Sequence, residues 1–189
     1  MKIAIDLNDV IRDFSRNFIK YYKKGVNHSI NEEEIEFYTN DMQLLLNFDS
    51  DEHYKRFVYE DYSYELFGKC PAVDKNLPRD LNKWIENEFE EDEIIFVSPM
   101  EYNLTIQSTF AFLSKIGSRV REVYFPVDSS TVWDKCDVLI TANPRFFKNK
   151  KEGKKIVKIT KEYNKEFNGD LEYDSLNSLI KDENFFNKL

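Results

Sequence analysis

The chain has 189 residues, of which 41% are hydrophobic and 33% are charged, and this composition is typical of a globular protein rather than a disordered one. Its 35 Asp and Glu residues outnumber its 27 Lys and Arg residues. The resulting net charge of −8 argues against a general binder of nucleic acid or of anionic membranes. No apolar run approaches the ~20 residues that a membrane-spanning helix requires.

Several features predict a cytoplasmic protein. The chain begins with an apolar stretch that Asp6 interrupts, which is unlike a signal peptide. Its two cysteines, Cys70 and Cys136, lie far apart without paired spacing, so we expect free thiols in a reducing compartment. His28 and His53 have no Cys or His neighbour at the spacing of a zinc site.

The first stretch of the chain predicts a buried strand that ends at Asp6, followed by a polar turn and a helix that begins near Asp9. After the turn, apolar residues recur at intervals of four: Val10, Phe14 and Phe18. Ligands of open parallel sheets bind beyond the carboxyl ends of the strands. We therefore expect Asp6 and Asn8 to point into a pocket.

Residues 28–67 predict a helical insertion with no strand. Short helices are expected over residues 32–38 and 41–48 and from Ser50 onwards, with Ser29 or Asn31 as a cap of the first. A segment of about 40 residues is too long for an ordinary connection between a strand and a helix. We expect it to cover the pocket, with residues 1–27 and 68–189 forming the main body.

The rest of the chain predicts four more strands that alternate with helices. The strands are expected over residues 93–97, 122–125, 137–140 and 155–159, and the main helices over 77–89, 101–116 and about 173–180. This alternation predicts the α/β class, with a doubly wound parallel sheet of five strands and right-handed crossovers.

Polar residues follow other strands at the edge of the sheet where Asp6 is expected. Ser98 follows the second strand, Asp128 and Ser129 come after the third, and Thr141 with Ala142 ends the fourth. With the first motif and the helical insertion, these segments resemble the haloacid dehalogenase-like phosphohydrolases, and more narrowly their 5′(3′)-deoxyribonucleotidase branch. The resemblance covers nearly the whole chain and implies a Rossmannoid sheet of order 3-2-1-4-5 with a cap after strand one.

The chemistry that this resemblance implies needs several groups. One aspartate attacks phosphorus, a second carboxyl group two residues later handles the proton, and a hydroxyl and a lysine hold the phosphoryl oxygens. An acidic pair after strand four binds Mg²⁺. Asp6 matches the nucleophile and Ser98 the hydroxyl, but the amide of Asn8 cannot transfer a proton, and Ser129 stands in the place of the lysine.

Thr141 and Ala142 stand where the acidic pair is expected, so the Mg²⁺ carboxylates are missing as well. Our first hypothesis is therefore a catalytically inactive domain, a pseudoenzyme that serves as an interaction or structural module with a protein partner. A bacteriophage-encoded accessory or virion protein fits the composition. The inactive domain needs no cofactor.

Two alternatives stay open. One is a divergent Mg²⁺-dependent phosphatase or 5′-nucleotidase with Asp6 as nucleophile and the metal at Asp6 and Asn8. The other is a non-hydrolytic binder of phosphate or nucleotide through Ser98.

A basic loop precedes the fifth predicted strand. It contains Lys148, Lys150, Lys151, Lys154 and Lys155. A dense charge run of this kind is ordinarily a solvated turn. The functional interpretation is a contact for an acidic partner or for a phosphate backbone.

Overall fold

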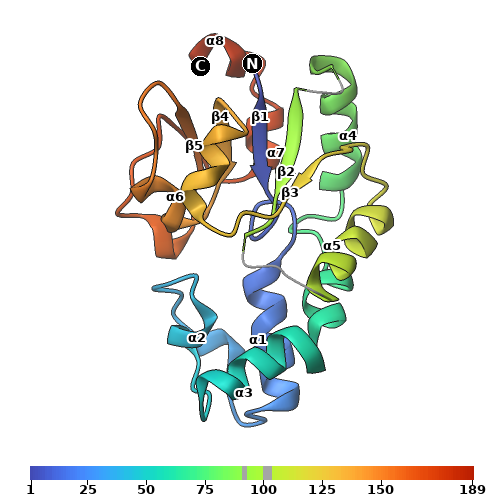
Figure 1. Cartoon of the computed structure of the whole chain (residues 1–189), viewed down its shortest axis with the longest axis vertical. Coiled ribbons are helices and arrows are strands. Elements are labelled where there is room, and N and C mark those ends of the chain that lie inside the picture. Colours follow the sequence, from blue (N-terminus) through green and yellow to red (C-terminus); the bar gives the residue numbers. More distant parts are fainter. Residues whose placement is uncertain (91–92, 100–103) are drawn as a thin grey trace.

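The computed structural model describes residues 1–90, 93–99 and 104–189, and its centre is a six-stranded sheet in which all neighbouring strands are parallel (Figure 1). The strands are β1 (Ile3–Asp6), β2 (Ile94–Val97), β3 (Val123–Tyr124), β4 (Val138–Thr141), β5 (Lys155–Ile159) and β6 (Leu171–Tyr173). Their order across the sheet is β3-β2-β1-β4-β5-β6. The order reverses at β1, as in doubly wound α/β sheets, so the α/β class is confirmed.

The sixth strand corrects two predictions. Five strands were expected, and the last helix was expected from Tyr173, but Tyr173 ends β6 and the helix α7 covers Leu176–Ile180. β6 pairs with β5, and the carboxylate of Glu172 forms an ion pair of 2.8 Å with Lys158, which is only 3% exposed. A strand of three residues is too short for the apolar alternation by which strands are recognised in a sequence.

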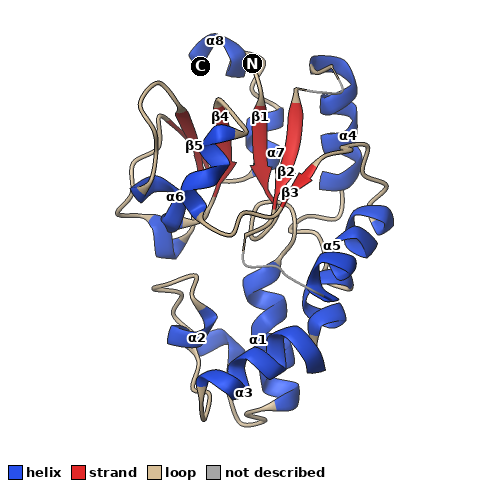
Figure 2. Ribbon diagram, viewed as in Figure 1, coloured by secondary structure: helices blue, strands red, loops and turns tan. Residues whose placement is uncertain are grey.

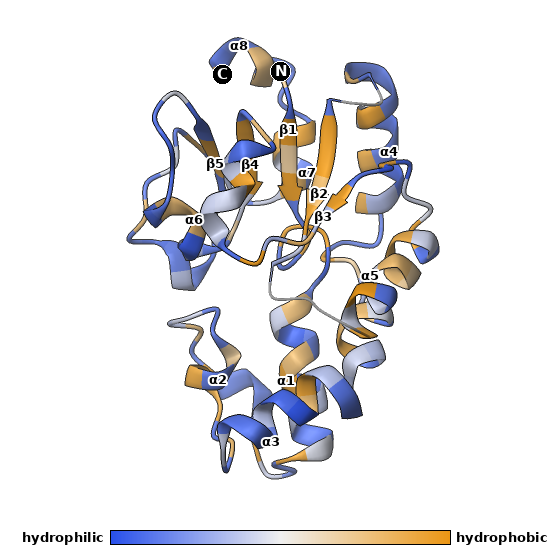
Figure 3. Cartoon of the chain, in the orientation of Figure 1, coloured by the Kyte–Doolittle hydropathy of each residue, from blue (hydrophilic) through white to orange (hydrophobic). Residues whose placement is uncertain are grey.

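Helices cover both faces of the sheet (Figure 2). On one face, Ile3 and Ile5 pack against α4 (Leu77–Glu88), α5 (Leu104–Lys115), α7 and α8 (Phe185–Lys188). On the other face, Ala4 packs against the 3-10 helix η4 (Ser129–Asp134) and α6 (Pro144–Lys148). Strands that are buried on both sides are apolar throughout, and Figure 3 shows β1 and β2 as strongly hydrophobic segments.

Residues 26–68 form the helical segment that the sequence predicts, without a strand. It contains η1 (Glu32–Glu34), α2 (Met42–Leu45), α3 (Asp51–Arg56) and the π-helical turns η2 (Phe57–Asp61) and η3 (Tyr64–Gly68), and it packs on α1 (Phe14–Gly25) beyond the ends of the strands (Figure 1). Its core is aromatic: the rings of Phe18, Phe48 and Phe57 lie 5.4–6.4 Å apart. Such aromatic pairs stabilise a fold by more than the burial of their surface area alone would. The helical segment therefore has a core of its own.

Helix boundaries in this segment depend on polar caps. The side chain of Asn31, one of the two predicted caps, accepts a hydrogen bond at the start of η1, and the side chain of Ser50 does so at the start of α3. The prediction of a helix over residues 32–38 was wrong beyond Glu34, because Ile35 has an extended backbone. The expected start of the helix over residues 101–116 lies outside the described residues, and α5 is described from Leu104.

Two predictions from composition can be compared with the structure. Cys70 and Cys136 are buried free thiols, as expected. In the described ranges, no helix combines the length and the apolar character that crossing a membrane requires.

Candidate functional site

Asp6 ends β1 with its carboxyl group closed off from solvent. Its exposed fraction is 0%, and it accepts hydrogen bonds from the hydroxyl of Thr141 (2.7 Å) and from the backbone N–H of Asn8 (3.3 Å). Burial is the largest influence and raises the pKa of Asp6 to about 7, although both hydrogen bonds lower it. In a large fraction of the molecules, Asp6 is therefore protonated near neutral pH.

The loop after β1 turns back on itself before α1 begins. Asp9 has a φ of 60°, in the left-handed region that non-glycine residues rarely adopt, and the N–H of Arg12 donates to the carbonyl of Leu7. The prediction of a helix from Asp9 was wrong, because α1 begins at Phe14. The turn instead directs the side chain of Val10 into the core beside the sheet.

The same turn places Arg12 at the end of β1, where it is 0% exposed. To acceptors among the described residues, its guanidinium makes five hydrogen bonds, and each of these acceptors is neutral. Nε and Nη2 donate to Oδ1 of Asn8 (2.9 and 2.6 Å), Nη2 to the hydroxyl of Ser98 (3.0 Å), and Nη1 to the hydroxyl of Thr109 (2.8 Å) and the carbonyl of Phe67 (3.1 Å). A guanidinium carries five N–H groups. The geometry thus engages every donor of Arg12 within the chain.

Aromatic rings enclose the guanidinium of Arg12. Its central carbon lies 5.1 Å from the ring centroid of Phe67, 5.6 Å from that of Phe112 and 5.9 Å from that of Phe14. Cation–π contacts of this kind gain strength where water is excluded. Arg12 was not among the site residues predicted from the sequence. The available signal was a single cation directly after two apolar residues, next to the predicted pocket.

The ends of β1 and β4 offer few ligands for Mg²⁺. Thr141 uses its hydroxyl to donate to Asp6 and to accept from the N–H of Asn143 (2.9 Å), and Ala142 contributes only a methyl group. Mg²⁺ in proteins is held by carboxylates and water in a nearly octahedral arrangement. One buried carboxyl group beside a hydroxyl and an amide does not fit this requirement. Within the described part of the chain, no group of three His, Cys, Asp or Glu residues is placed to hold a metal ion.

The hydroxyl of Thr141 supports Asp6, and its removal tests this arrangement. We expect Thr141→Val to lower the free energy of unfolding by about 1 to 3 kcal/mol above pH 7, because the buried carboxylate loses its side-chain donor. Urea denaturation at pH 8 measures the effect. Thr160→Val is the matched control: Thr160 is only partly buried, and no side-chain hydrogen bond of its hydroxyl is found among the described residues. An equal loss in both variants would contradict the role of Thr141.

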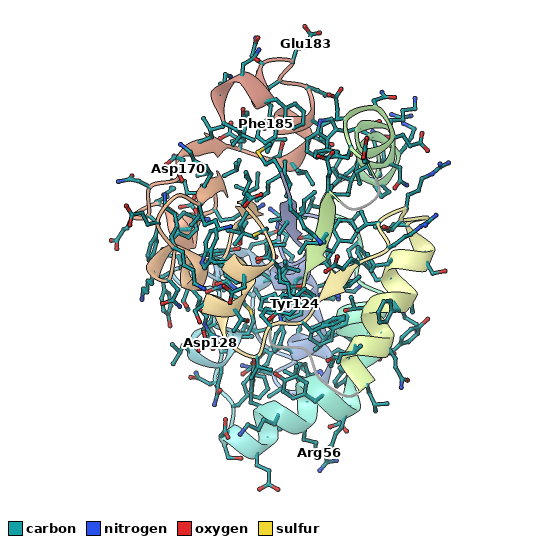
Figure 4. All side chains as sticks on the ribbon, turned by 45° about the horizontal axis from the view of Figure 1, so that its top comes forward. Arg56, Tyr124, Asp128, Asp170, Glu183 and Phe185 are labelled. Atoms are coloured by element: carbon teal, nitrogen blue, oxygen red, sulfur yellow. The ribbon has the colours of Figure 1, made fainter. Side chains whose placement is uncertain are left out.

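The structure places the two predicted serines in different surroundings. Ser98 is 0% exposed, and its hydroxyl accepts from Arg12. Ser129 begins η4, and its hydroxyl accepts from the side chain of Asn149 (2.7 Å) rather than reaching Asp6. The preceding residue, Asp128, is exposed at the outside of the molecule (Figure 4). The structure therefore brings Asp6, Asn8 and Ser98 together, but not Ser129.

The lysines of the basic loop are largely engaged within the chain. Three of them form ion pairs: Lys150 with Asp170 (2.8 Å), Lys151 with Asp134 (2.5 Å) and Lys154 with Asp137 (2.9 Å). Lys148 lies 6.0 Å from the ring centroid of Phe167, and Lys155 is exposed at the start of β5. Surface ion pairs are individually weak. They nevertheless reduce the positive charge that this loop presents to an acidic partner.

Asp9 belongs to a second polar cluster. Its carboxylate accepts from the N–H of Ser15 (2.8 Å), from the hydroxyl of Ser15 and from the hydroxyl of Tyr163 (2.9 Å). Burial and the nearby carboxylate of Asp9 raise the pKa of Tyr163 well above its usual value. The partners of Asp9 are Ser15 and Tyr163 rather than Asp6, so Asp9 does not replace the carboxyl group that Asn8 lacks.

Comparison with known proteins adds no family to these observations, since no protein-family model and no curated protein matches the chain. A fold of this class hosts many unrelated functions. Function must therefore be inferred from the site itself.

Proposed function

We propose that the chain is a haloacid dehalogenase-like domain that does not hydrolyse phosphate esters and acts as a protein-interaction or structural module. The observation that carries this proposal is the buried guanidinium of Arg12 between Asn8 and Ser98. The hydroxyl that the resemblance assigns to phosphate is bound to an internal cation, and that cation has all five donors engaged. A substrate phosphoryl group would have to displace this packed side chain.

The remaining groups support the same proposal. Phosphoryl transfer needs an ionised nucleophile, a proton donor and positive charge to balance the anions. Burial suppresses the ionisation of Asp6 near neutral pH, and the amide of Asn8 holds no transferable proton. Thr141 and Ala142 supply no carboxylate for a cation.

A hydrolysis assay tests the absence of catalysis. We expect the wild-type chain and Asp6→Asn to release phosphate from p-nitrophenyl phosphate and from deoxynucleoside monophosphates at the same background rate, with Mg²⁺ in the buffer. Hydrolysis by the wild-type chain that Asp6→Asn abolishes would show that Asp6 is a working nucleophile, and the proposal would then be wrong.

A thermal-shift assay tests whether the site still binds phosphate without turnover. Ligands that bind only the folded state raise the melting temperature. We expect inorganic phosphate and deoxynucleotides to leave it unchanged, because Ser98 and Asn8 are occupied by Arg12. A saturable shift that Ser98→Ala removes would favour a phosphate-binding module instead.

A further inference from the structure

The molecule has two lobes, each with a core of its own. The helical lobe comprises residues 14–68, which contain α1 and the helical segment, and the sheet lobe comprises residues 1–10 and the described part of residues 74–189 (Figure 2). The aromatic core around Phe18 lies within the helical lobe, and two other cores lie on the two faces of the sheet. Because each lobe packs around its own core, one lobe can move against the other without unfolding.

Two linkers join the lobes and run side by side. The N–H of Asp13 donates to the carbonyl of Pro71 (2.9 Å), and the N–H of Val73 donates to the carbonyl of Ile11 (2.9 Å). η3 packs along α5 next to the linkers, whereas α2 lies below α6 on the opposite side of the molecule (Figure 1). Hinges consist of a few residues at the ends of elements that absorb changes in the backbone torsions. The paired linkers therefore form a hinge, about which α2 would separate from α6.

The lobes are closed on each other at the ends of the strands. Residues of both lobes, among them Asn8, Tyr54 and Pro99, line a cavity of about 30 Å³. A cavity of this size holds water, whereas the binding sites of small molecules usually have volumes of about 300 Å³ or more. The closed arrangement therefore leaves too little space in this cavity for a ligand of that size.

The guanidinium of Arg12 lies next to the hinge and contacts both lobes. It donates to the carbonyl of Phe67 in the helical lobe (3.1 Å), and to the hydroxyls of Ser98 (3.0 Å) and Thr109 (2.8 Å) in the sheet lobe. Its central carbon lies 5.1 Å from the ring centroid of Phe67 and 5.6 Å from that of Phe112 in the sheet lobe. Rotation of one lobe would break these contacts where Arg12 is 0% exposed, and a buried cation without partners is costly.

A second contact joins the lobes on the opposite side. Nη2 of Arg145 in α6 lies 3.1 Å from Oδ2 of Asp41, which precedes α2. The side chains of Arg145 and Asp41 are 48% and 25% exposed. An exposed ion pair contributes little to stability and is screened by salt. This pair is therefore the weaker of the two contacts.

We propose that Arg12 locks the hinge, so that the helical lobe stays closed on the sheet lobe and the ion pair of Asp41 with Arg145 is dispensable for closure. The lock makes the two lobes one rigid body. A rigid surface that spans both lobes binds a partner without the entropic cost of ordering them. The lock does not depend on whether the chain hydrolyses phosphate esters, so a failure here is distinguishable from a failure of the proposed function.

The two buried thiols of the chain measure opening of the hinge. Cys70 adjoins Pro71 in the linker and is 0% exposed, so opening of the hinge makes it accessible. Cys136 is 2% exposed and is packed in a core of the sheet lobe, so it reports unfolding of that lobe. The rate at which each thiol reacts with an excess of a disulfide reagent is measured by mass spectrometry of peptides. The ratio of the rate of Cys70 to that of Cys136 separates opening of the hinge from a loss of overall stability.

We expect Arg12→Lys to raise this ratio at least about tenfold over the wild type, because a single ammonium nitrogen cannot replace the guanidinium contacts with both lobes. Asp41→Asn is the matched control, since it keeps a capping side chain before α2 but removes the charge that pairs with Arg145. We expect the control to change the ratio by less than about threefold. An unchanged ratio in Arg12→Lys, or an equal rise in both variants, would overturn the proposal.

A second measurement keeps Arg12, so it does not depend on the folding of an Arg12 variant. Spin labels are attached at Leu44→Cys in the helical lobe and Asn168→Cys in the sheet lobe, two exposed positions, and pulsed EPR gives the distance between them. We expect the same single distance at about 0.1 M and at about 1 M NaCl, because salt screens the exposed ion pair but not the buried guanidinium. A second population at 1 M NaCl in which the distance is longer by more than about 2 Å would show that the ion pair holds the lobes closed, which contradicts the proposal.

Discussion

Replacement of Arg12 by alanine is expected to lower the free energy of unfolding by about 3 to 5 kcal/mol. The change removes a side chain that is 0% exposed and, with it, the hydrogen bonds that Arg12 donates to Asn8, Ser98, Thr109 and Phe67. Urea denaturation monitored by circular dichroism measures the loss. Arg12→Lys keeps the charge but has three donors on one nitrogen, so we expect it to recover only part of the lost stability.

Arg16→Ala is the matched control, because Arg16 is exposed one turn further along the chain. It should change stability by less than about 0.5 kcal/mol. If Arg12→Ala were as stable as Arg16→Ala, the guanidinium would not hold the strand ends together. A chain whose stability is unaffected by Arg12→Ala, and which then gains phosphate binding, would indicate instead that Arg12 only blocks a usable pocket.

The second large effect concerns pH. Because the pKa of Asp6 is raised from 3.8 to about 7 in the folded state, the folded state holds a proton that the unfolded state releases between these two values. Stability is therefore greatest below pH 4 as far as Asp6 is concerned, and it falls as the pH rises towards 7. The full contribution is about 4 kcal/mol, since each pKa unit corresponds to about 1.4 kcal/mol.

Asp6→Asn removes this titration and leaves the neutral acceptors of Arg12 unchanged. We expect the variant to be more stable than the wild type at pH 8 and to lose most of the dependence on pH between about 5 and 8. Chemical denaturation over this pH range tests the prediction. Asp13→Asn serves as the control, because the pKa of Asp13 is raised in the same direction but its side chain is only partly buried. An unchanged pH profile in Asp6→Asn would show that Asp6 titrates normally.

The carboxyl group of Asp6 costs stability where it stands, because the folded state raises its pKa. A buried carboxyl group with a raised pKa is common at working catalytic sites. Here its neighbours are an arginine bonded to neutral acceptors and the hydroxyl of Thr141, so the chain carries the energetic cost without the proton-handling partner. This combination is what our proposal of a domain that has lost catalysis predicts for Asp6.

The class of the fold and the position of the site could be predicted from the sequence. The apolar runs at residues 94–97, 138–141 and 155–159 are strands because residues buried on both faces of a parallel sheet must be apolar, and that requirement is visible in one dimension. The polar residues after these runs meet at one edge because parallel strands end together. Asp6, Asn8 and Ser98 could therefore be placed near one another without coordinates.

The way in which that edge is filled depends on contacts between segments that are far apart in the sequence. The partners of Arg12 are separated by 4 to 97 residues along the chain, and no local pattern indicates that they share one cation. The left-handed turn at Asp9 also had no signal in the sequence, because the apolar spacing after it imitates a helix. Long-range contacts override local periodicity where packing at the end of a strand contributes more free energy than the helix propensity of a few residues.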